Sequence, residues 1–88
     1  MNIDRLGRFE VSTELIREFG TKISPLFKDV IVTRAEGLWH KGTIEYIGFS
    51  DKFEPVLEGE VIPSYRVMVY NIEGRMEFSF ERLYERML

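Results

Sequence analysis

The sequence contains no cysteine, one histidine and three prolines in 88 residues. Without cysteine, the chain can form no disulfide, no thiolate metal site and no cysteine nucleophile. No apolar run approaches the ~20 residues that a membrane-spanning helix requires. The charged start of the chain also lacks the apolar stretch of a signal peptide. We therefore expect residues 1–88 to form a single soluble domain in the cytoplasm, without membrane contact.

Motifs that carry catalysis are also missing. The sequence has no phosphate-binding loop, no Gly-x-Gly-x-x-Gly and no Gly-x-Ser-x-Gly elbow. Acid–base chemistry near neutral pH would depend on His40, for which an exposed position in a strand or turn is the simpler interpretation. The sequence therefore predicts a protein that is not an enzyme and that needs no cofactor or metal. A weak hydrolase that uses His40 is the enzymatic alternative.

Negative charge is concentrated in one segment. The whole net charge of −3 lies in residues 51–60, where Lys52 accompanies the acids Asp51, Glu54, Glu58 and Glu60. Elsewhere the signs alternate, and no basic stripe is present to neutralise phosphates, so direct nucleic-acid binding is not expected. The spacing of the acids does not match an EF-hand loop, which argues against a metal site. A solvated loop and a docking surface for a basic partner remain as interpretations.

The first part of the chain carries the signals of a short helix over residues 12–20. Ser12 or Thr13 can cap its N-terminus, and Gly20 suits the position that ends a helix. The preceding residues 3–11 have mixed charges and are compatible with either a strand or an extended arm.

A hairpin is predicted next. Residues 29–35 are rich in β-branched side chains, which favours a strand. Glu36-Gly37 provides a turn, and a second strand is predicted over residues 38–49, with Gly42 as a candidate bulge.

A second hairpin is predicted over residues 64–72 and 75–80, after a long loop at residues 50–63. Beyond Phe80 the periodicities of a strand and of a helix coincide, and we expect a short helix to begin at Glu81. The predicted fold is therefore α+β. It has an antiparallel sheet of about four strands in two hairpins, one N-terminal helix packed on it and a short C-terminal helix.

Two of the predicted strands are apolar on both faces. Along residues 64–72, Tyr65 and Val67 alternate with Met68 and Tyr70, and along residues 38–49, Ile44 and Tyr46 oppose Ile47 and Phe49. One helix can cover only one face of such a sheet. The other face must be covered by the loop and termini, by a target or by a second copy, and we expect a homodimer.

Trp39 admits two interpretations, because it follows the predicted turn and lies among charged neighbours. It is either a core residue or a surface anchor, since Trp is among the residues that dominate binding hot spots.

Two resemblances are visible. Trp39-His40-Lys41-Gly42 followed by Gly59-Glu60-Val61-Ile62-Pro63-Ser64-Tyr65 resembles the Trp and the Gly-x-x-Pro-x-x-Tyr element of SH3-like barrels, although the spacing is longer and a helix precedes it. Residues 53–65, with an aromatic start, Glu-Gly-Glu and Ile-Pro-x-Tyr, resemble a pattern in small bacteriophage and prophage accessory proteins. This second resemblance implies a phage origin and a binding role, often the inhibition of a host enzyme or defence complex.

The leading hypothesis is a non-enzymatic protein that binds and inhibits a host protein or protein complex. Its predicted partner-binding residues are Trp39, Tyr46, Tyr70, Asp51, Glu54, Glu58 and Glu60. One alternative is an oligomeric sponge that sequesters a nucleotide signal, with Arg34 and Arg66 as phosphate ligands. Another is an SH3-like binding module.

Overall fold

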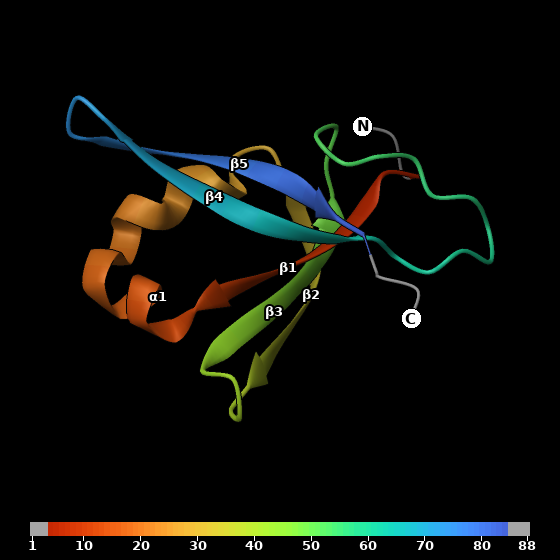
Figure 1. Cartoon of the computed structure of the whole chain (residues 1–88), viewed down its shortest axis with the longest axis horizontal. Coiled ribbons are helices and arrows are strands. Elements are labelled where there is room, and N and C mark those ends of the chain that lie inside the picture. Colours follow the sequence, from red (N-terminus) through yellow and green to blue (C-terminus); the bar gives the residue numbers. More distant parts are fainter. Residues whose placement is uncertain (1–3, 85–88) are drawn as a thin grey trace.

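The computed structural model describes residues 4–84 as an α+β domain built on one five-stranded sheet (Figure 1). In chain order the elements are β1 (Leu6–Ser12), α1 (Thr13–Phe19), the 3₁₀ helix η1 (Gly20–Phe27), β2 (Ile31–Leu38), β3 (Thr43–Phe49), β4 (Ser64–Ile72) and β5 (Arg75–Leu83). The strand order is β2-β3-β1-β4-β5. The predicted α+β class, N-terminal helix and two hairpins are confirmed.

The segment before the helix is the central strand, which makes the prediction of four antiparallel strands wrong. Strand β1 pairs antiparallel with β3 along its whole length and parallel with β4 at Arg8↔Ser64 and Phe9↔Tyr65. Alternate residues of β1 are buried, as in a strand whose one face meets the core. The sheet is therefore mixed. Its edge strands β2 and β5 do not pair with each other, so it does not close into a barrel.

The turn of the first hairpin lies further along the chain than predicted. Strand β2 continues through Gly37 to Leu38, and the amides of Lys41 and Gly42 both donate to the Leu38 carbonyl at 3.0 Å. Gly42 has φ +66°, a left-handed conformation that favours glycine, whereas Gly37 has no positive φ. The conformation of Gly42 thus sets the turn and moves Trp39 to the tip of the hairpin.

The predicted C-terminal helix is not present in the described residues. Strand β5 runs on to Leu83, which pairs with Ser64 of β4. Met76, Phe78 and Phe80 are half-buried on one face of β5. This segment therefore follows the period of a strand and not that of a helix. Residues 85–88 of the predicted helix lie outside the described residues.

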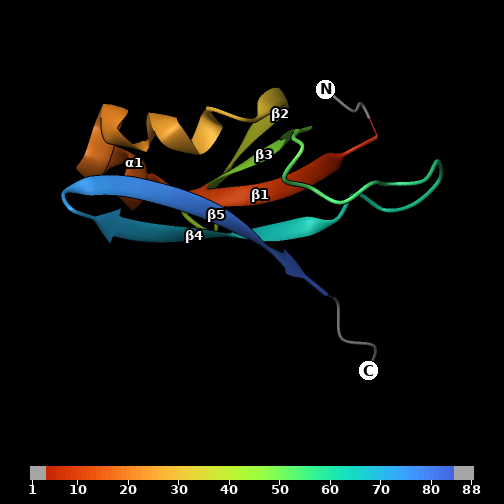
Figure 2. The same cartoon turned by 90° about the horizontal axis from the view of Figure 1, so that it is seen from above.

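The core lies between the sheet and the two helices, which cover one face of the sheet (Figure 2). Its buried residues are Phe9, Val11, Leu26, Val30, Phe53 and Tyr65. The loop at residues 50–63 contributes Phe53, whose ring stacks on Tyr65 at 4.6 Å and meets the edge of Phe80 at 4.9 Å. The Arg5 guanidinium donates to the Phe53 carbonyl at 2.7 Å, which ties the loop to the start of β1.

The opposite face of the sheet is open among the described residues. Cross-strand pairing places Ile31, Phe49 and Leu6 in one row on this face, with Ile47 beside them on β3. On β4 the same face carries Met68, Tyr70 and Ile72, whereas Tyr65 and Val67 face the core. The two-sided apolar character predicted for these strands therefore leaves a face on which partly or fully exposed apolar side chains lie among charged ones, which we call the open face.

Candidate functional site

Trp39 lies at the tip of the β2–β3 hairpin, and 95% of its surface is exposed. No other large hydrophobic residue among the described residues is as exposed. An indole in this position adds nothing to the core, so Trp39 is a surface residue of the folded chain. Of the two interpretations of Trp39 from the sequence, the core position is excluded.

The turn that carries Trp39 is nevertheless fixed. The backbone amide and the hydroxyl of Thr13 both donate to the Gly42 carbonyl, at 2.9 and 3.0 Å, which joins the hairpin to the start of α1. The hydroxyl of Thr43 donates to Glu10 at 2.8 Å, and the Lys41 ammonium lies 3.6 Å from the same carboxylate. These contacts hold the hairpin tip against α1 and β1, so the indole is presented on a rigid support.

The two tyrosines of the predicted site lie on opposite faces of the sheet. Tyr46 is half-buried on the core face, with its ring 5.4 Å from that of Phe9 and 5.0 Å from that of Phe27. Burial raises the pKa of the Tyr46 phenol, which favours its neutral form in the folded chain. Tyr70 is exposed on the open face. Tyr46 therefore serves packing, and only Tyr70 is placed to meet a partner.

Two of the four loop acids have contacts within the chain. Glu54 pairs with Arg82, and its amide donates to the Tyr65 hydroxyl at 2.7 Å. The Glu60 carboxylate accepts from the Leu57 amide at 2.8 Å. Asp51 and Glu58 are exposed, and neither forms an ion pair within residues 4–84. Glu54 and Glu60 therefore help to fix the conformation of the loop, in addition to contributing to its negative charge.

The residues of the alternative hypotheses are dispersed. Arg34 pairs with Glu36 at 3.6 Å and Arg66 with Glu81 at 3.7 Å. Three strand spacings separate β2 from β4, which is about 14 Å along the sheet, so the two arginines do not converge on one phosphate. His40 is exposed in the hairpin turn and has no hydrogen-bonded or ion-pair partner among the described residues.

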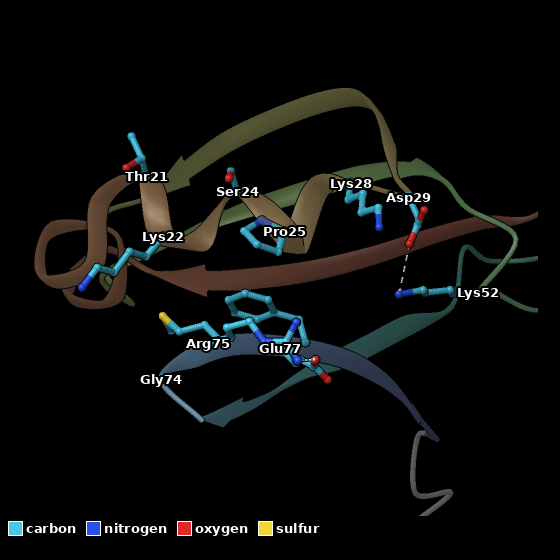
Figure 3. A pocket seen from close by; sticks show the side chains of 12 residues that line it. Thr21, Lys22, Ser24, Pro25, Lys28, Asp29, Lys52, Gly74, Arg75 and Glu77 are labelled. Atoms are coloured by element: carbon cyan, nitrogen blue, oxygen red, sulfur yellow. Dashed lines mark ion pairs between the residues drawn. The ribbon is translucent and has the colours of Figure 1, made fainter. Parts of the chain in front are cut away.

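A second feature is a groove of about 850 Å³ between η1 and the free edge of β5 (Figure 3). We call it the basic groove, because its lining holds four cations against two carboxylates. The cations are Lys22 of η1, Lys28 directly after η1, Lys52 of the loop and Arg75 of β5; the carboxylates are Asp29 and Glu77. The groove thus carries a net charge of +2 on a chain whose net charge is −3.

The geometry of η1 explains how the groove acquires its lysines. Side chains three residues apart eclipse each other in a 3₁₀ helix. One such row, Ile23 and Leu26, is buried against the sheet. Another, Lys22 and Pro25, lines the groove together with Lys28, the residue that follows the helix. This site was not predicted from the sequence, because the predicted helix ended at Gly20. A search for a period of three after Gly20 would have found both rows.

No protein-family model matches the chain, and comparisons with curated proteins and with solved structures give no match either. Within residues 4–84, no helix is long and apolar enough to cross a membrane. In the same part of the chain, no three His, Asp or Glu side chains gather into a set that could hold a metal ion. The candidate surfaces are therefore the hairpin tip with Trp39, the open face and the basic groove.

Proposed function

We propose that the chain is a non-enzymatic binding protein that inhibits a host macromolecule, and that it docks through the hairpin tip with Trp39 as its anchor. The observation that supports this proposal is the exposure of Trp39 on a fixed turn. The resemblance of residues 53–65 to phage accessory proteins supports a target in the cytoplasm of a bacterial host. A protein or protein complex is the expected class of target.

The large indole of Trp39 can contribute much of the free energy of binding. Covering a Trp side chain removes roughly 150–250 Å² from water, which at ~25 cal/mol per Å² corresponds to about 4–6 kcal/mol before the costs of association. The contacts of Thr13 and Glu10 fix the turn before a partner arrives, which reduces the entropy lost on binding. Trp39 therefore has the properties of a binding hot spot.

We expect Trp39→Ala to leave the fold intact and to abolish capture of the target. Because the side chain is exposed, the substitution should change the free energy of unfolding by no more than about 0.5 kcal/mol, or about 3 °C in melting temperature. Loss of a hot-spot contact of about 2 kcal/mol should weaken binding roughly 30-fold. The measurements are a thermal melt and affinity capture from a host lysate with mass spectrometry.

The matched control is Leu57→Ala, which removes another exposed apolar side chain, 73% accessible, from the acidic loop. This variant should capture the same proteins as the unsubstituted chain. A Trp39→Ala protein that is folded and captures the target as well as the control would refute the role of the hairpin tip.

We also propose that the protein is a homodimer that buries the open face. The supporting observation is the row of Ile31, Phe49 and Leu6, in which Ile31 is exposed and the other two side chains are partly exposed. Light scattering at micromolar concentration should give twice the mass of the chain. Ile31→Glu should yield a monomer, whereas Val61→Glu, at an exposed apolar residue outside the open face, should remain dimeric. A monomeric unsubstituted protein would contradict this proposal.

A further inference from the structure

We propose that the basic groove binds an extended acidic peptide, which adds to the sheet as a strand alongside β5. This inference goes beyond the proposed function, because it concerns a surface that does not include the hairpin tip or the open face. It assigns the chain a second partner contact, with a defined chemistry: main-chain pairing to β5 and carboxylates facing Lys22 and Lys28.

Strand β5 has a free edge at which a further strand could pair. Strand β5 pairs with β4 on one side, in a register without a shift from Ser64↔Leu83 to Ile72↔Arg75. Its other side faces the basic groove, and no backbone hydrogen bond among the described residues joins it to η1. An edge strand with unpaired amides and carbonyls is a template for another strand.

The other edge of the sheet is less suited to this pairing. Strand β2 has a register shift between Val32 and Arg34, and the hydroxyl of Thr33 donates to the Ile47 carbonyl there. A bulge of this kind bends and twists an edge strand, which disrupts a regular ladder. The regular edge of the sheet is therefore the one beside the cations.

The charge of the groove favours an acidic ligand. Lys52 lies 3.3 Å from Asp29, and Arg75 lies 3.8 Å from Glu77, so these two cations already have partners. Lys22 and Lys28 form no ion pair within residues 4–84. Figure 3 shows Lys22 on η1 and Lys28 directly after it, across the groove from β5. Two ammonium groups spaced along a groove suit carboxylates that are distributed along an extended chain.

The side chains of the groove suit a peptide better than a nucleic acid. Single strands of nucleic acid stack their bases on exposed aromatic rings. The one aromatic residue of the groove is Phe78, which is half-buried on the core face of β5. Pro25, Met76 and Phe78 instead provide apolar contacts for the methylene groups of side chains that point toward η1. In a peptide that alternates acidic and apolar residues, every carboxylate can point toward η1 while the apolar side chains point to the other face, so such a peptide fits the groove.

The test is a titration of the ¹⁵N-labelled full chain with a short peptide that alternates Glu and Val, followed by NMR. This method detects millimolar binding, so a peptide of generic sequence suffices. We expect the amide signals of residues 75–79 and 21–28 to shift with one dissociation constant, while the signals of Trp39 and the hairpin tip stay in place. Shifts that saturate elsewhere, or no shifts at millimolar peptide, would overturn the proposal.

Two further probes isolate the two parts of the recognition. The same peptide with N-methylated backbone amides keeps its charge but cannot pair with a strand, and it should bind at least about tenfold more weakly. A peptide that alternates Lys and Val should not bind. Equal binding of the methylated peptide would refute strand addition. Tighter binding of a single-stranded oligonucleotide at the same residues would overturn the peptide proposal in favour of a nucleic acid as the ligand.

Paired variants test the lysines. Lys22→Glu combined with Lys28→Glu should weaken binding of the Glu-Val peptide at least about tenfold. Arg17→Glu combined with Arg34→Glu makes the same change in net charge outside the groove and should alter the affinity less than about twofold. If both double variants lost the same affinity for the peptide, net charge alone would explain the effect, and the proposal would be overturned. Trp39→Ala should bind the peptide normally, so failure of the proposed function and failure of this inference give different results.

Discussion

Phe53→Ala is expected to cost about 3–5 kcal/mol of the free energy of unfolding. The side chain is 1% exposed, and its ring contacts Phe9, Tyr65 and Phe80. A domain of this length has a total stability of roughly 4–13 kcal/mol, so the loss would be a large part of it. The melting temperature should fall by at least about 12 °C in a calorimetric or circular-dichroism melt.

Two variants show whether the ring or the loop is responsible for this effect. Phe53→Leu keeps most of the volume and should retain most of the stability, losing chiefly the aromatic contacts. Leu57→Ala, at an exposed position of the same loop, should melt within about 3 °C of the unsubstituted chain. If Phe53→Ala melted as Leu57→Ala does, the loop would not be part of the core.

Gly48→Ala is expected to detach the start of β2 from β3, at a cost of about 1–3 kcal/mol. A Cβ at position 48 would lie 2.5 Å from the Ile31 carbonyl oxygen and 3.0 Å from Cγ1 of Val30. The obstacle includes backbone, so the strand itself must move. Hydrogen exchange measured by NMR should show faster exchange of the amides of Ile31 and Val32, with little change in β4 and β5.

Gly37→Ala is the matched control, because it makes the same substitution on the same hairpin. A Cβ at position 37 would meet no atom within 4 Å, and the residue has no positive φ. Alanine there should stabilise the fold by about 0.4–1 kcal/mol, since it reduces the entropy of the unfolded chain. Opposite signs for the two substitutions would confirm the close approach at Gly48, and equal effects would refute it.

The local signals in the sequence were sufficient for the helix at Ser12 and for the hairpin at Glu73-Gly74, where both turn residues have positive φ. They were insufficient for β1, because its mixed charges lie on the open face and its buried residues include a glycine. The parallel pairing with β4 leaves no local signal, since it joins residues distant in the chain. Neighbouring residues alone could not place β1 at the centre of the sheet.

For the candidate site, the sequence left Trp39 as either a core residue or a surface anchor, because it could not decide the burial of the side chain. That depends on whether Gly37 or Gly42 forms the turn, and both are preceded by polar residues. Tyr46 and Tyr70 looked equivalent because each alternates with apolar neighbours, and only strand register separates their faces. The basic groove combines η1, β5 and Lys52, which are far apart in the sequence, so no single segment predicted it.

The short parallel contact between β1 and β4 has a consequence for how the domain forms and opens. Each hairpin closes over a brief stretch of chain, whereas the pairs Arg8↔Ser64 and Phe9↔Tyr65 must wait for the two halves to meet. We therefore expect the sheet to open first at this junction, with each hairpin keeping its own hydrogen bonds. Separation would split the aromatic cluster around Phe53, so the side chain that closes the long loop is also the one that holds the two halves together.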